Sequence, residues 1–131
     1  MTKKLFLFDI DGTLISPGSV SRNILAQTIS KVTNTPVDLG YDDVAGFTDR
    51  SITRNALTKI NYGGMVFEPV LNSILDQYVE SMKEEFSTSA LPFIYKDCIT
   101  LLDAVEMAGH STCLLTGNMK SVSKIKLEKF G

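Results

Sequence analysis

The sequence contains few cysteines, and it has no large excess of positive or negative charge. Cys98 and Cys113 are the only cysteines among 131 residues. Each lies inside an apolar segment, so we expect two reduced core residues rather than a disulfide. The formal net charge is -2 at pH 7. That small negative charge argues against a nucleic-acid-binding face and against an anchor for anionic membranes.

Long hydrophobic runs are also missing. No stretch approaches the ~18 apolar residues of a membrane-spanning helix, and the apolar run near the N-terminus is too short for the core of a secretory signal. We therefore expect a cytoplasmic location and no membrane partner. The single histidine, His110, follows Gly109 in a predicted turn, which favours a surface role over catalysis.

The overall composition is typical of a globular protein, with 44% hydrophobic and 21% charged residues. A chain of 131 residues is ordinarily one domain, or a small domain that carries an insert, and it can bury a usable core.

The most informative segment runs from Leu5 to Thr13. Its first half is apolar without alternation, which predicts a parallel strand covered on both faces. Asp9 and Asp11 follow directly, and Gly12 then allows a turn that a residue with a Cβ would resist. Buried carboxylates need a partner or a metal, and open α/β sheets bind ligands at the C-terminal ends of their strands. We therefore expect the two acids to lie at a binding site.

Three helical patterns follow, with no strand between them. A helix is expected after Ser19 or Ser21 and should end near residues 34–36. A second is expected over about 51–60, and the clearest amphipathic stripe covers 69–86. Because a βαβ crossover needs only ~30 residues in all, these helices predict an insert. Loops are expected over 14–18 and 37–43.

The chain then returns to a sheet pattern through a small, polar joint over residues 87–92. A helix over about 99–107, which Gly109 can terminate, precedes a second strand over 111–115. A final helix is expected over about 121–130, with its lysines on a solvated face. These patterns predict an α/β protein with a parallel sheet and a helical insert.

Both predicted strands end in polar residues, and parallel strands place those ends at one edge of the sheet. The first strand leads into Asp9 to Thr13, and the second leads into Thr116, Gly117 and Asn118. A carboxylate can attack phosphorus as a nucleophile, and a second carboxylate two residues further on can move the proton. A threonine hydroxyl and backbone N–H groups at the start of a helix suit phosphate oxygens. The convergence therefore favours phosphoryl transfer.

The same residues resemble the motifs of the haloacid dehalogenase-like superfamily, and more narrowly its phosphoglycolate-phosphatase-like branch. Phe8–Leu14 matches the first motif of that family, and Leu115–Asn118 resembles its second. Gly46–Arg50, followed by Ile52, is similar to a cap segment of that branch, and Lys124–Gly131 looks like the helix after the second motif. The likeness spans nearly the whole chain.

The resemblance implies a Rossmann-like parallel sheet with an inserted helical cap. The domains that it implies are an α/β core from residues 1–15 and 90–131 and a cap from residues 16–89. It also implies a Mg2+-dependent phosphomonoester hydrolase that acts on a small phosphorylated metabolite.

Within that resemblance, Asp9 would attack the phosphoryl group to give an aspartyl-phosphate. Asp11 would protonate the leaving oxygen and later deprotonate the hydrolytic water. Mg2+ would be held by the Asp9 carboxylate and the Asp11 backbone carbonyl, with waters and phosphate completing its coordination. The implied phosphate-binding residues are Gly12, Thr13, Thr116, Gly117 and Asn118.

Two residues of the cap segment have alternative interpretations. Thr48 and Arg50 either reach the substrate, or they belong to a helix start that is capped at Asp49 or Ser51 and carries a solvated arginine.

The resemblance departs from the family pattern after the second motif. The family's third motif, a Lys or Arg, and its fourth, an acidic pair, both lie further along the chain, whereas this sequence stops at Gly131. Lys120, Lys124 and Lys126 belong to the helix after the second motif and do not replace the third. We expect a piece of a longer enzyme, a naturally short relative, or a half that pairs with another chain.

A two-stranded parallel sheet would leave an open apolar edge, and we expect little or no turnover from the chain as given. Two other functions stay open: a phosphomutase of the same superfamily, and a catalytically silent module that binds phosphate or assembles with a partner. The residues favour neither a particular substrate nor an oligomeric state.

Overall fold

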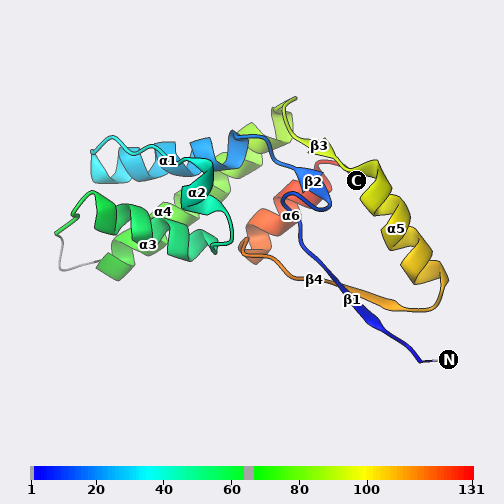
Figure 1. Ribbon diagram of the computed structural model, residues 1–131. Coiled ribbons are helices and arrows are strands. Elements are labelled where there is room, and N and C mark those ends of the chain that lie inside the picture. Colours follow the sequence, from blue (N-terminus) through cyan, green and yellow to red (C-terminus); the bar gives the residue numbers. More distant parts are fainter. Residues whose placement is uncertain (1, 64–66) are drawn as a thin grey trace. The chain divides into compact units, whose positions relative to one another are not determined.

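The computed structural model describes residues 2–63 and 67–131 (Figure 1). Contacts within the chain group it into two compact units. The first, here called the sheet unit, comprises Met1–Gly18 and Ala90–Thr116. The second, called the helical unit, comprises Ser19–Ser89 and Gly117–Gly131.

The sheet unit contains the predicted parallel strands. β1 (Leu5–Phe8) pairs in parallel with β4 (Ser111–Leu114), and Phe8 lies opposite Leu114. α5 (Lys96–Met107) immediately precedes β4 and packs against it. Parallel neighbours need a long crossover connection, and here it contains the Ser19–Ser89 part of the helical unit and α5. The predicted mixed α/β fold with a parallel sheet is confirmed.

A second, smaller sheet lies where the sequence predicts loops. β2 (Ile15–Ser16) pairs antiparallel with β3 (Phe93–Ile94), and the Tyr95 amide donates a hydrogen bond to the Leu14 carbonyl at 2.9 Å. Strands this short show no periodicity in a sequence, so the predicted loop over 14–18 was wrong at β2. This ribbon pairs the segment that leaves the sheet unit with the segment that returns to it.

Apolar side chains of the parallel sheet are largely exposed. Leu5 and Leu7 of β1 are 61% and 56% exposed, whereas Phe8 is buried at 6%. The prediction that both faces of this strand are covered is therefore wrong for the part of the chain that the structure describes. Cys113 of β4 is exposed and Cys98 is half-buried. Both cysteines are free, as predicted, but Cys113 is not a core residue.

The helical unit is built on helices with the predicted apolar spacing. α1 (Val20–Thr33), α3 (Asp49–Lys59) and α4 (Phe67–Ser81) pack against one another, and a π-helical segment, η1 (Met82–Phe86), continues α4. α1 ends at Asn34, whose φ of 52° is left-handed and stops the helix. The predicted helices over these segments are confirmed.

Between α1 and α3, the predicted loop over 37–43 is partly wrong, because residues Tyr41–Val44 form a short helix, α2. Its first turn carries Asp42 and Asp43, and negative charge is favourable at a helix N-terminus.

The helical unit encloses an apolar core. Side chains with no exposed surface are Ile29, Leu57, Leu71, Ile74, Met82 and Phe86. Fully burying such a side chain contributes about 1.5–3 kcal/mol relative to exposure. Of the helices in the described ranges, none is both long and apolar enough to cross a membrane.

The last helix, α6 (Lys120–Glu128), belongs to the helical unit and packs on η1. Val122 is fully buried, and the Lys129 ammonium donates hydrogen bonds to the carbonyls of Ser87 at 3.1 Å and Ser89 at 2.6 Å. These contacts group residues 117–131 with the helices, whereas the expected core domain groups them with the sheet. The expected domain boundaries stay a prediction.

Candidate functional site

A tight turn follows β1 and carries both predicted acids. Ile10 has no exposed surface, and its carbonyl oxygen accepts three backbone hydrogen bonds. The donors are the amides of Thr13 at 3.2 Å, Leu14 at 2.9 Å and Ile15 at 3.1 Å. Gly12 adopts a φ of +78°, a left-handed value that favours glycine. The predicted role of Gly12 in the turn is confirmed by this geometry.

Asp9 is the first residue after β1, and its side chain is oriented by the backbone. Its Oδ1 atom accepts a hydrogen bond from the Ile10 amide at 2.7 Å. Its Oδ2 atom has no hydrogen-bond partner within residues 2–63 and 67–131. Asp9 is exposed. One carboxylate oxygen is thus held in place, and the other can meet a ligand.

The parallel register brings two predicted site segments to one edge of the sheet. The Leu115 amide donates to the Phe8 carbonyl at 2.8 Å, so the pairing continues one residue past β4. Asp9 and Thr116 therefore leave the paired strands at the same end. Asp11, in the turn after Asp9, and Thr116 are both half-buried. The two strand ends converge as the sequence predicts.

The amides of Gly12 and Thr13 are used within the turn itself. Gly12 donates to the Ile15 carbonyl at 2.8 Å, and Thr13 donates to Ile10. The Thr13 hydroxyl has no hydrogen-bond partner among the described residues. Among the donors of Gly12 and Thr13, the Thr13 hydroxyl is therefore the one that can bind a phosphoryl oxygen.

Gly117 and Asn118, the other predicted phosphate-binding residues, belong to the helical unit. The Gly117 carbonyl accepts a hydrogen bond from the Asp49 amide at 3.0 Å. A Cβ added at Gly117 would lie 2.6 Å from the Phe47 carbonyl oxygen, closer than real side chains approach. Glycine is therefore required at this position by the packing of the segment before α3.

Two buried charged residues contact this loop, and the sequence did not identify either as part of a site. The Asp49 carboxylate accepts a hydrogen bond from the Met119 amide at 2.8 Å. The Lys126 ammonium donates to Asn118 Oδ1 at 2.7 Å. Asp49 is 6% exposed and Lys126 is 2% exposed.

The predicted solvated lysine face of α6 is correct for Lys124, which is exposed, and wrong for Lys126. Lys126 lies four residues after the fully buried Val122 and next to the buried Ile125. That helical spacing places Lys126 on the inner face of α6. The burial of Lys126 could have been predicted from this spacing in the sequence. Asp49 lies inside the cap-like segment Gly46–Arg50, but only long-range structure reveals its contact with Met119.

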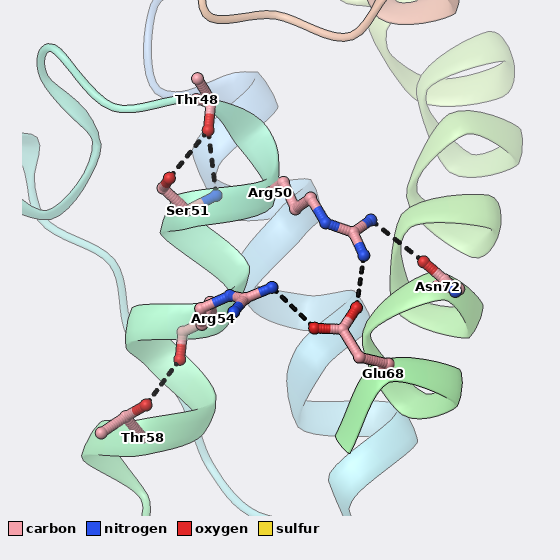
Figure 2. A network of polar contacts seen from close by, with 7 residues as sticks. All are labelled: Thr48, Arg50, Ser51, Arg54, Thr58, Glu68 and Asn72. Atoms are coloured by element: carbon pink, nitrogen blue, oxygen red, sulfur yellow. Dashed lines mark hydrogen bonds and ion pairs between the residues drawn. The ribbon is translucent and has the colours of Figure 1, made fainter. Parts of the chain in front are cut away.

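Thr48 caps α3. Its backbone is extended and its Oγ1 accepts a hydrogen bond from the Ser51 amide at 3.1 Å, as Figure 2 shows. The capping interpretation named Asp49 or Ser51, and the capping residue is instead Thr48. Its side chain is exposed.

Arg50 is part of a surface network between α3 and α4 (Figure 2). Its guanidinium forms an ion pair with Glu68 and donates to Asn72 Oδ1 at 3.1 Å. Arg54, one turn further along α3, pairs with the same carboxylate at 2.7 Å. All three charged side chains are about half exposed. In this structure Arg50 joins two helices of the helical unit, and its predicted contact with substrate stays a prediction.

The two acids after β1 suit Mg2+ by their chemistry. Mg2+ prefers oxygen ligands and usually binds through one or two carboxylates while it keeps several waters. The Asp9 carboxylate and the Asp11 backbone carbonyl offer oxygen donors of this kind. Within the described residues, no group of three or more histidine, cysteine or acidic side chains could hold a metal ion. The donors present therefore fit a partly hydrated Mg2+ and not an all-protein metal cage.

A cleft of about 400 Å³ lies elsewhere in the helical unit, beside α2 and α3. Its lining includes Leu39, Ile52 and Ala56 together with Asp38 and Asp43. The Gly40 amide and the Lys59 ammonium, which lies 3.0 Å away, lower the pKa of Asp43 below its usual 3.8. None of the predicted site residues lines this cleft.

No protein-family model matches the chain, and no curated protein matches it. Solved structures share its fold, and two of them are described here. One is a hydrolase from Pseudomonas syringae, with a TM-score of 0.68 and 13% identity over 97% of this chain. The other is a predicted phosphoglycolate phosphatase from Haemophilus somnus, with a TM-score of 0.66 and 18% identity over 98% of this chain.

The matched regions span 56% and 58% of the lengths of those two proteins. At such low identities the likeness establishes the fold alone. It confirms the predicted α/β architecture, and it agrees with the resemblance to haloacid dehalogenase-like phosphatases at the level of the fold.

Proposed function

We propose that this chain carries the nucleophile of a Mg2+-dependent phosphomonoester hydrolase of the haloacid dehalogenase-like type, acting on a small phosphorylated metabolite. The parallel register of β1 and β4 carries the proposal, because it places Asp9 and Thr116 at one edge of the sheet. The fold shared with a hydrolase and with a predicted phosphatase supports it.

We assign the attack on phosphorus to one oxygen of Asp9. Oδ1 is occupied by the Ile10 amide at 2.7 Å, so Oδ2 is the oxygen that attacks phosphorus. The new Oδ2–P bond forms as the bond between phosphorus and the ester oxygen breaks. The hydrogen bond on Oδ1 holds the carboxylate in one orientation, which is the main requirement in phosphoryl transfer.

Asp11 handles the proton at both stages. In its protonated form it donates to the departing ester oxygen, so the alcohol leaves neutral. As a carboxylate it then takes a proton from the water that attacks the aspartyl-phosphate, which releases phosphate and restores Asp9. Its half-buried position in the turn after Asp9 is compatible with both steps.

The transferring phosphoryl oxygens would be held by hydroxyl and backbone donors. In this proposal the hydroxyls of Thr13 and Thr116 would bind these oxygens, and the resemblance assigns the same task to Gly117 and Asn118. The Asp9 carboxylate and the Asp11 carbonyl would hold Mg2+, which would neutralise charge on the phosphoryl group.

Phosphate release from a panel of phosphate esters tests the proposal. It should be measured with Mg2+ and with a chelator, for the wild type and for Asp9→Asn. The substitution keeps the size of the side chain and an acceptor oxygen but removes the nucleophilic charge. We expect release that needs Mg2+ and is lost in Asp9→Asn, which would also eliminate a silent binding module.

Because the chain spans just over half of the compared structures, a low rate is expected from this chain by itself. Release that is equal in the wild type and Asp9→Asn would contradict the proposal. Transfer of the phosphoryl group to a sugar phosphate instead of water, with release of a sugar bisphosphate, would identify a phosphomutase.

A further inference from the structure

The loop of residues 117–119 is held in place by the start of α3. The Asp49 backbone amide donates to the Gly117 carbonyl at 3.0 Å, and the Asp49 carboxylate accepts from the Met119 amide at 2.8 Å. One residue therefore binds the loop on both sides of Asn118. The contact at 2.6 Å that a Gly117 Cβ would make with the Phe47 carbonyl shows how closely the two segments pack.

The same loop is also bound by a residue of α6. The Lys126 ammonium donates to Asn118 Oδ1 at 2.7 Å, across a separation of eight residues. Charged hydrogen bonds of this kind are shorter and stronger than neutral ones. Three successive loop residues thus each have a hydrogen bond to Asp49 or Lys126, all within the helical unit.

Both charged groups are almost completely removed from water, at 6% exposure for Asp49 and 2% for Lys126. A buried charge is costly unless hydrogen bonds compensate it. An apolar side chain at either position would fill the space without that cost. The placement is explained if the charges maintain a particular loop geometry.

We propose that Asp49 and Lys126 are positioning residues for the phosphoryl-binding loop. This inference rests on the proposed function, because the loop's own task is to hold phosphoryl oxygens. The Asp49 carboxylate accepts a hydrogen bond from the Met119 amide and so holds the last residue of the loop in place. Lys126 orients the Asn118 side chain and brings a positive charge next to the loop. The start of α3 and the α6 residue Lys126 thereby control the geometry of this loop.

The positioning contact can be measured without any activity, by hydrogen exchange at the Met119 amide in the full chain. Asp49→Ala removes the acceptor, so exchange at Met119 should accelerate about tenfold or more, beyond any change in global stability. Asp49→Asn keeps an acceptor oxygen at the same place and should restore most of the protection. Asp76→Ala, on an exposed position of α4, is the matched control and should leave Met119 unchanged.

Binding of inorganic phosphate in the presence of Mg2+, followed by calorimetry, tests the consequence for the site. Asp49→Ala and Lys126→Met should each weaken binding about tenfold, whereas Asp49→Asn and Lys126→Arg should recover much of the loss. Lys124→Met removes an exposed lysine from the same helix and should have no effect. Rescue by the conservative variants separates positioning from a general loss of folding.

The inference would be overturned if Asp49→Ala left the exchange rate of the Met119 amide unchanged. It would also be overturned if Asp49→Ala and Lys126→Met both left the phosphate affinity unchanged. If Asp49→Ala does not fold, the conservative variants Asp49→Asn and Lys126→Arg still test the inference. If both fold but lose as much phosphate affinity as Lys126→Met, the inference is overturned. A wild-type chain that binds no phosphate would instead count against the proposed function, while Met119 exchange would still report on the contact itself.

Discussion

The helices of the helical unit and the parallel strands of the sheet unit bury their apolar side chains to very different extents. Ile74 and Phe86 of the helical unit have no exposed surface, whereas Leu7 of β1 and Leu115 after β4 are 56% and 63% exposed. The helices pack on one another around a common core. The parallel strands have one strand neighbour each among the described residues.

This contrast separates two properties of the chain. Apolar burial, which is the main source of stability, is concentrated in the helical unit. The carboxylates of the proposed chemistry, Asp9 and Asp11, lie in the sheet unit, where apolar side chains of β1 and β4 are exposed. Substitutions in the two units should therefore have different consequences.

The largest expected difference is between a core residue of the helical unit and an exposed residue of the sheet. Ile74→Ala should lower the free energy of unfolding by about 2–5 kcal/mol, because it removes buried methyl groups and leaves a cavity. Leu7→Ala should change it by less than about 1 kcal/mol, since most of that side chain already meets water. Urea denaturation of both variants measures the contrast, and equal losses would break it.

A smaller effect is expected where Gly117 packs against the segment before α3, within the helical unit. Gly117→Ala forces a Cβ to within 2.6 Å of the Phe47 carbonyl, and the backbone must move, at a cost of about 1–3 kcal/mol. Gly63→Ala is the matched control, because its Cβ would meet nothing closer than 3.9 Å. A Gly117→Ala protein as stable as the control would show that the two segments do not pack this closely.

The surface network of the helical unit should contribute less again. Arg50→Ala breaks its ion pair with Glu68 and its hydrogen bond to Asn72. Because these groups are about half exposed, we expect a loss of about 0.2–1 kcal/mol in unfolding free energy. The loss should shrink at high salt. A loss as large as that of Ile74→Ala would contradict the account of where stability resides.

The smallest effect is on pH dependence and concerns Asp43. The Gly40 amide and the Lys59 ammonium lower its pKa below 3.8 in the folded chain. The stability it contributes is therefore present above its ordinary pKa and is lost as the pH falls through the lowered value. NMR titration of the Asp43 carboxyl should give a pKa below 3.8, and Lys59→Met should move it upward. A folded-state pKa at or above the ordinary value would refute this.

Much of the architecture could be predicted from the sequence because its causes are local. The apolar spacing in α1, α3 and α4 reports which helix faces are buried. The uninterrupted run of β1 followed by Asp9 and Asp11 indicates a strand that ends at a site. The parallel pairing of β1 with β4 then follows from the order of strand, helices and strand.

The features that were not predicted depend on distant residues or on very short elements. The contact between Asp49 and Met119 spans 70 positions in the chain, and no local pattern encodes it. The burial of Lys126 depends on which face of α6 packs inward. The β2–β3 ribbon has only two residues in each strand, too few to show a period.

The central claim is that Asp9 is a nucleophile toward phosphorus, and its covalent product can be observed directly. The chain would be incubated with Mg2+ and a small acyl phosphate, then treated with borohydride, which reduces an aspartyl-phosphate to homoserine, and analysed by peptide mass spectrometry. We predict homoserine at residue 9, dependent on Mg2+ and absent from Asp9→Asn. Homoserine at residue 11 instead, or modification that persists in Asp9→Asn, would contradict the account.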